Sequence, residues 1–180
     1  MLRQQGQPRV ARSLYNRALA ISERVHGPDH PHTAFSLNGL ARLLHSQGEL
    51  HAAKILFERA LSIRQRALGP DHPYTAITVN CLALLLHTQG ELDGAKILFE
   101  RALDIRQRIL GHDHPRTAES LHHLAVLLRA QGDPAAARPL FERALAIRER
   151  VFGPNHPDTV ATKGALAELA AEGDGSPEKA

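Results

Sequence analysis

The chain has 180 residues, of which 43% are hydrophobic and 4% aromatic, and its net charge is +3. This composition, with no tryptophan, favours helices packed through Ala and Leu over a β-sandwich. The single cysteine, Cys81, excludes an intramolecular disulfide framework and favours a reducing compartment. The sequence contains neither a membrane-spanning apolar run nor the apolar core of a signal peptide, so we expect a cytoplasmic protein that does not enter a membrane. Basic residues are scattered among acidic ones, which is typical of solvated helix faces and argues against a nucleic-acid partner.

The chain consists largely of copies of one 42-residue unit. Residues 49–90 and 91–132 are identical at 28 of 42 positions. Self-similarity at a fixed period is typical of stacked repeat proteins. Two markers recur at this period: a Gln-Gly pair, and a Gly followed three residues later by His-Pro. These markers divide each unit into two helical segments, which we name the A helix and the B helix in chain order.

The N-terminal residues predict a partial unit. The first Gln-Gly, at Gln5 and Gly6, marks the end of an A helix, and the segment from Pro8 to His26 predicts a B helix whose own A helix is missing. One face of this B helix would therefore be covered on one side only. The apolar residues of that face are Ala11, Leu14, Tyr15, Ala18 and Leu19.

Each complete A helix is predicted to begin at the His-Pro marker and to end at Gly48, Gly90 or Gly132. Proline is favourable at the first helical position, and Asp71 or His72 before it can cap the free backbone amides. A terminal glycine suits the left-handed backbone that ends helices. Leucines recur with helical spacing and predict one buried stripe per helix. They are Leu37, Leu40 and Leu44, then Leu82, Leu85 and Leu86, then Leu121, Leu124 and Leu128.

The B helices are predicted over residues 50–68, 92–110 and 134–152, with Ala53, Phe57 and Ala60 in the buried stripe of the first. A glycine ends each B helix. Pro139 occupies a position that is Ile in the two preceding units, and because proline lacks an N–H group we expect a kink or a late helix start there.

The last A helix is predicted from Pro157 to about Ala171 and differs from the others. Lys163 and Ala170 replace two leucines of the stripe, as expected for the polar cap of a solenoid. The final residues have the composition of a disordered tail. The predicted organisation is a partial unit at 1–27, units at about 28–69, 70–111 and 112–153, a capping helix at 154–172 and a disordered tail at 173–180.

A period of this size is also compatible with HEAT or armadillo repeats. The residues favour another family, because Ala53-x3-Phe57-x2-Ala60-Leu61 and its copies resemble the tetratricopeptide pattern. The Leu-Gly-Pro-Asp-His-Pro-x-Thr-Ala segment between helices is similar to the kinesin light chain type of this repeat. The resemblance implies an all-α fold, a right-handed α-solenoid of antiparallel helix pairs. In that family the A helices line a concave groove that binds peptides or protein surfaces.

The resemblance also implies which residues face the groove. Asparagines of a Leu-Asn-Asn-Leu-Ala motif bind peptide backbone in the family, and here the first Asn of the motif is kept at Asn38 and Asn80. The second is replaced by Gly39, Cys81 and His123. An alternative role for the two asparagines is hydrogen bonding to the neighbouring helix. The predicted groove residues are Phe35, Asn38, Arg42 and His45, then Ile77, Asn80, Leu84 and His87, then Glu119, His122, Val126 and Arg129.

Catalytic, cofactor and metal sites are not predicted. The chain lacks a phosphate-binding glycine loop and the motifs of zinc peptidases and serine hydrolases. Four of the twelve histidines belong to the repeated turn and lie a whole unit apart, too far to share one ion. We therefore expect a non-catalytic module that binds a protein or peptide. Two alternatives remain: a regulatory repeat array within a larger signalling protein, and self-association through the uncovered N-terminal helix.

Overall fold

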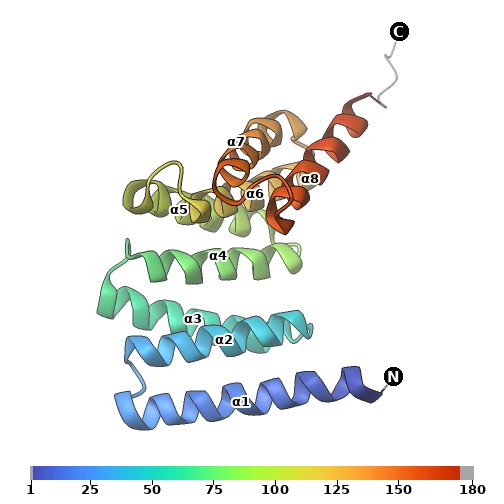
Figure 1. Cartoon of the computed structure of the whole chain (residues 1–180). Helices are drawn as coiled ribbons and strands as arrows, with labels where there is room; N and C mark the ends of the chain where they lie inside the picture. Colours follow the sequence, from blue (N-terminus) through green and yellow to red (C-terminus); the bar gives the residue numbers. More distant parts are fainter. Residues whose placement is uncertain (1, 175–180) are drawn as a thin grey trace. The chain divides into compact units, whose positions relative to one another are not determined.

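The computed structural model describes residues 2–174 and the side chains of residues 9–172, and within these residues all regular secondary structure is helical (Figure 1). The chain divides into two compact units, one formed by residues 1–91 and the other by residues 92–180. The first unit contains α1 (Leu2–His26), α2 (Pro31–Ser46), α3 (Leu50–Leu68) and α4 (Pro73–Thr88). The second contains α5 (Leu92–Leu110), α6 (Pro115–Ala130), α7 (Pro134–Phe152) and α8 (Pro157–Asp174). The A helices are α2, α4, α6 and α8, and the B helices are α1, α3, α5 and α7.

The helix starts follow from the repeated His-Pro pair, as predicted. Proline is the first helical residue of α2, α4 and α6, and the preceding histidine is the N-cap. The Nδ1 atom of His72 accepts a hydrogen bond of 3.1 Å from the backbone N–H of Tyr74, so His72 rather than Asp71 caps α4. His30, His114 and His156 make the same contact in their own turns. The repeated histidines are therefore explained by helix capping.

The helix ends require glycine. Gly48 and Gly69 have φ angles of 78° and 95°, and their counterparts in the other repeats also have positive φ. At Gly69 the ψ angle is 160°, a combination that a residue with a Cβ atom rarely adopts. α1, α3, α5 and α7 end directly before such a glycine, and α2, α4 and α6 end two residues before one.

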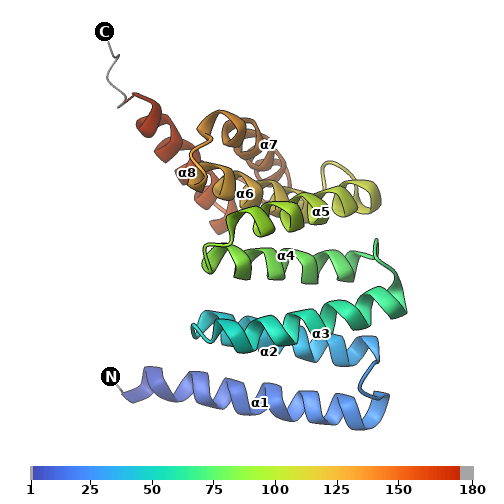
Figure 2. The ribbon, with the colours of Figure 1, turned by 180° about the vertical axis from the view of Figure 1, so that it is seen from behind.

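In the first unit, α1 packs against α2, and α3 packs against both α2 and α4. Figures 1 and 2 show α1 and α4 on opposite sides of the α2–α3 pair. The core at the α2–α3 contact is formed by Ala34 and Leu37 of α2 with Ala60 and Ile63 of α3. Small alanines let the two helices approach closely, and Phe57 is fully buried beside them, which confirms the predicted stripe.

The second unit repeats this arrangement, with α6 packed against α5 and α7, and α8 packed against α7 and α6. Ala118, Leu121, Ala144 and Ile147 form its core. In α8, Lys163 is exposed at a position that is a buried leucine in α2. This position of α8 contacts water, which allows a charged residue there; the capping role of α8 stays a prediction.

Three predictions about helix bounds are wrong. α1 begins at Leu2 rather than Pro8 and passes through Gly6 without a turn. α7 begins at Pro134, so the late helix start expected from Pro139 is wrong, while the alternative of a kink there stays a prediction; the proline removes one backbone hydrogen bond in the second turn. α8 continues to Asp174, whereas the tail was predicted from residue 173. The remainder of the predicted tail, residues 175–180, lies outside the described residues.

Candidate interaction surface

The twelve predicted groove residues lie on the A helices α2, α4 and α6, with spacings that place each group of four on one helix face. Their exposure separates them into three classes. Phe35 and Arg42 are exposed, and Asn38 and Asn80 are buried. The half-buried residues are His45, Ile77, Leu84, His87, Glu119, His122, Val126 and Arg129. α2 and α4 belong to the first unit and α6 to the second.

Asn38 is buried but incompletely bonded. Its side chain is 7% exposed, and the Oδ1 atom makes no hydrogen bond within the described part of the chain. The next residue, Gly39, is held against the preceding B helix, because a Cβ atom there would lie 2.7 Å from the ring of Tyr15. An asparagine at this position would require the Tyr15 ring to shift.

His45 connects the two A helices of the first unit. Its Nε2 atom lies 2.9 Å from the Oγ1 atom of Thr88 on α4. Burial lowers the pKa of His45, since desolvation disfavours the charged imidazolium. His45 therefore holds α2 beside α4 in addition to lining the surface.

In the second unit, Glu119 of α6 binds two arginines. Its carboxylate lies 3.3 Å from the guanidinium of Arg106 and 3.2 Å from that of Arg116. Burial raises the pKa of Glu119, but Arg106, His123 and Arg116 more than offset this effect, so the pKa lies below its usual range. Glu119 is a structural ion-pair partner as well as a surface residue.

His122 is the most strongly perturbed group of the predicted surface. Desolvation, together with Arg148 and His123, lowers its pKa to about 4. Its Nδ1 atom lies 3.3 Å from the hydroxyl of Thr162, which also accepts a hydrogen bond from Arg148. His122 is therefore neutral at pH 7. Farther along α6, Arg129 pairs with Glu168 of α8 at 2.6 Å.

Sequence reasoning missed a set of buried arginines, one per complete B helix: Arg64, Arg106 and Arg148. Each Nη1 atom donates to a backbone carbonyl of the next A helix, from Arg64 to Tyr74 at 2.7 Å and from Arg106 to Arg116 at 2.8 Å. Each also donates to a hydroxyl one turn later, on Thr78, Ser120 or Thr162. The sequence feature that could have indicated these buried arginines is the repeated Ile-Arg pair, which places an arginine beside a core isoleucine in three units. In α1 the equivalent position is Ser22.

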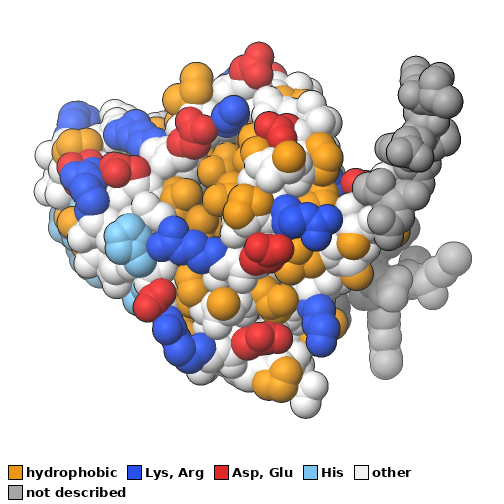
Figure 3. All heavy atoms as spheres, turned by 90° about the horizontal axis from the view of Figure 1, so that it is seen from above, with side chains coloured by type: hydrophobic (Ala, Val, Ile, Leu, Met, Phe, Trp, Pro, Cys, Tyr) orange, Lys and Arg blue, Asp and Glu red, His pale blue; other side chains and the backbone are white. Residues whose placement is uncertain are grey.

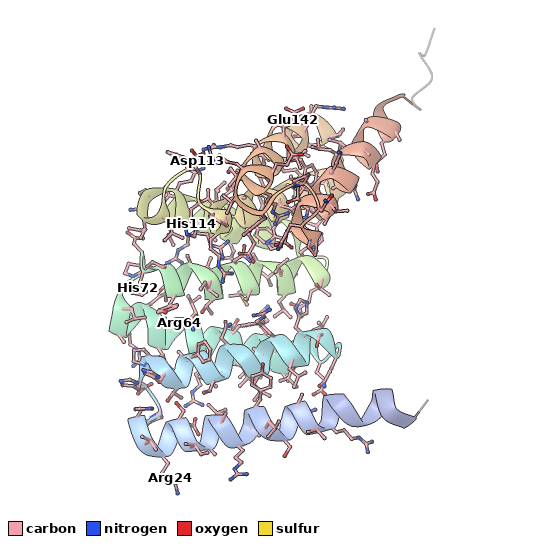
Figure 4. The ribbon with its side chains drawn as sticks, viewed as in Figure 1. Arg24, Arg64, His72, Asp113, His114 and Glu142 are labelled. Carbon is pink, nitrogen blue, oxygen red and sulfur yellow. The ribbon has the colours of Figure 1, made fainter. Side chains whose placement is uncertain are left out.

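A pocket of about 180 Å³ opens beside Arg64. Figure 4 shows Arg64 and His72 toward the same end of the first unit, near the turn that joins α3 to α4. Three elements line this pocket, with Pro31, His32 and Phe35 from α2, Arg64 and Leu68 from α3, and Tyr74 from α4. The pocket is therefore lined both by exposed Phe35 of the A-helix surface and by the buried guanidinium of Arg64.

Other surface features are less localised. The face shown in Figure 3 carries acidic and basic side chains interspersed among hydrophobic ones. Among the described residues, no group of three or more His, Cys, Asp or Glu side chains is arranged to hold a metal ion. None of the helices in that part of the chain is long and apolar enough to cross a membrane.

Comparison with known proteins identifies the family. A tetratricopeptide repeat model matches residues 1–66, 74–150 and 121–180. The chain belongs to the tetratricopeptide repeat family. A search of curated proteins gives no match.

Solved structures narrow the repeat type. One similar structure is a Podosopora anserina protein described as a kinesin light chain with nearly identical TPR-like repeats. It is 28% identical, with a TM-score of 0.75, over 96% of this chain and 82% of its own. A variant of that protein gives the same identity and coverage with a TM-score of 0.76. BtubC (BKLC) from P. vanneervenii, 23% identical, has the same fold, with a TM-score of 0.75 over 99% of this chain and 79% of its own. The tetratricopeptide repeats of this chain are therefore of the kinesin light chain-like type.

Proposed function

We propose that this tetratricopeptide chain is a non-catalytic interaction module that binds a peptide or protein surface on the face of its A helices. Repeats of this family act as scaffolds for protein–protein contacts, and a preformed helical surface binds with little backbone rearrangement. The ligand would lie across α2 and α4 in the first unit.

The observation that carries this proposal is the exposure of Phe35. Its side chain is 71% exposed, although the aromatic residues of α3, α5 and α7 at the repeat's aromatic position are fully buried. A large aromatic side chain on the surface beside a pocket is the residue type that dominates binding energy in protein interfaces. Arg42 lies two turns further along the same face of α2, and it and the half-buried Leu84 of α4 extend the surface with charged and apolar groups. Asn38 adds a buried acceptor that a ligand N–H group would satisfy after a small side-chain movement.

A selection from random peptides displayed on phage tests the proposal. Selected peptides should lose affinity for Phe35→Ala by at least tenfold, as expected when an aromatic anchor is truncated. The matched control is Ile55→Ala on the B helix α3, because Ile55 is also apolar and 52% exposed. Peptides that lose affinity for the Ile55 variant but not for the Phe35 variant would place the binding surface on the B helices instead.

The exposed face of α1 is a second candidate surface, for self-association. Val10, Leu14, Ile21 and Val25 are large apolar residues on this helix, and Leu14 is 60% exposed. The other B helix of the unit, α3, packs between two A helices, whereas α1 packs against α2 alone in the described part of this unit. Burial of this face against a second copy would remove apolar area from water. Sedimentation of the wild type and Leu14→Glu tests this: a dimer that the variant abolishes supports it, and a monomer at every concentration rejects it.

A further inference from the structure

Arg64 is a buried cation with donors left for a ligand. The residue is 3% exposed, and its two hydrogen bonds within the described residues, to Tyr74 and Thr78, both come from Nη1. A guanidinium carries five N–H donors, so Nε and Nη2 retain theirs. The ring of Tyr74 lies 5.7 Å from the guanidinium carbon and stabilises the charge from one side. Because Arg64 is also one of the residues that line the pocket, a ligand in the pocket meets a buried cation.

In the next repeat, the equivalent arginine has a carboxylate partner that Arg64 does not have among the described residues. Arg106 occupies the same register and lies 3.3 Å from the carboxylate of Glu119. In the first unit the residue at the Glu119 position is Ile77, and no acidic side chain of the described residues forms an ion pair with Arg64. Burial lowers the pKa of Arg64, and only Cys81 and Tyr74 oppose this effect. A buried charge without an opposite charge is unfavourable, and a carboxylate in the pocket would relieve it.

The walls of the pocket restrict what carries that carboxylate. Phe35, Leu68, Pro31 and Tyr74 offer apolar surface, which suits methylene groups next to the acid. The volume of about 180 Å³ is below the usual range for small-molecule sites, so it suits one side chain rather than a whole cofactor. Arginine binds carboxylates with paired N–H groups, which gives the contact a defined geometry.

We propose that this pocket binds an Asp or Glu side chain of the ligand peptide, with the carboxylate on Nε and Nη2 of Arg64 and the methylene groups against Phe35 and Leu68. This inference rests on the proposed function in one respect, since it takes the ligand to be a peptide. The pocket then anchors one acidic residue, while the rest of the peptide runs over α2 and α4.

The inference is tested by NMR titration of the full chain with N-acetylglutamate α-amide, which carries one side-chain carboxylate. We expect saturable shifts of the Arg64 Nε–H and Tyr74 amide signals, with a dissociation constant of about 1–10 mM for a ligand of this size. The neutral N-acetylglutamine α-amide should bind at least fivefold more weakly. N-acetylleucine, which carries a main-chain carboxylate, should also bind more weakly; stronger binding by it would overturn the assignment to an acidic side chain.

A variant supplies the matched control. Ile77→Glu places a carboxylate where Glu119 stands in the second unit, and it should abolish binding of the glutamate probe, whereas Ile77→Gln should not. Equal shifts with the glutamate and glutamine probes, or unchanged probe binding in Ile77→Glu, would overturn the inference. The proposed function is tested separately: peptides that need Phe35 but contain no acidic residue would retain the function and reject the acidic anchor. If the probe binds at Arg64 but no selected peptide depends on Phe35, the acidic anchor would be retained and the proposed function rejected.

Discussion

The carboxylate of Glu119 lies 3.3 Å from the guanidinium of Arg106, and this pair shows how one repeat position changes the chemistry of the surface. The arginine is present in all three complete B helices. At the position opposite it, the two repeats at residues 49–132 differ, because one has Ile77 and the other has Glu119. With Glu119 the cation is neutralised within the chain. With Ile77 the cation is left for a ligand.

Ile77→Glu should stabilise the protein. The new carboxylate would pair with buried Arg64, and we expect a gain of about 1 kcal/mol, or roughly 2–4 °C in the midpoint of thermal unfolding. Circular dichroism melting measures it. Ile77→Gln is the control for lost apolar area, and an Ile77→Glu protein that melts no higher than this control would show that Arg64 needs no carboxylate.

Glu119→Gln should reduce stability in a pH-dependent manner. The folded protein holds the pKa of Glu119 below its usual range, so its carboxylate contributes stability above the unfolded pKa of about 4.5, and this contribution is lost as pH falls through the folded value. Denaturant unfolding should therefore show wild type more stable than the variant at pH 7, by about 1–3 kcal/mol, and the difference should decrease below pH 4.5. A constant difference from pH 7 to pH 3 would contradict the ion pair.

His122 should remain neutral in the folded protein until about pH 4. Its pKa is lowered from about 6.5, so the unfolded chain takes up a proton first, and stability should decrease as pH falls from 6.5 to 4. The loss should reach up to about 3 kcal/mol and should be absent in His122→Asn. Titration of the imidazole signals by NMR gives the pKa directly; a value near 6.5 would reject the buried environment.

Arg64→Met should destabilise the protein more than Arg66→Met. Arg64 is buried and donates to the carbonyl of Tyr74, whereas Arg66 is exposed and pairs with exposed Asp29. We expect a loss of about 2 kcal/mol at Arg64 and less than about 0.5 kcal/mol at Arg66 in urea unfolding. Equal losses would show that the buried hydrogen bonds do not hold α3 to α4.

Most of the fold was predictable from the sequence because the repeated residues act locally. His72 caps a helix two residues away, and Gly69 ends one through its own backbone angles, so both features can be inferred from spacing alone. The start of α1 was not predictable in the same way. The same Gln-Gly pair lies in a turn at Gly48 and inside a helix at Gly6, so the pair alone does not determine where a helix ends.

The candidate surface was less predictable because it depends on neighbours that are distant in sequence. The family register predicts Phe35 in the groove, and its side chain is exposed, but the register does not show that Glu119 is bound to Arg106 or that Asn38 is buried. Arg64 was missed for the same reason. An arginine next to an isoleucine in the sequence is expected at the border of a buried helix face. The burial of Arg64 depends on its hydrogen bonds to the carbonyl of Tyr74 and the hydroxyl of Thr78, which are distant in sequence.

Binding of a ligand on the A helices is measured most directly by the NMR footprint of a phage-selected peptide on the isotope-labelled chain. We predict that the perturbed backbone amides lie on α2 and α4 and include Phe35 and Ile77. Perturbations confined to α1 and the exposed side of α3 around Ile55 would contradict binding on the A helices.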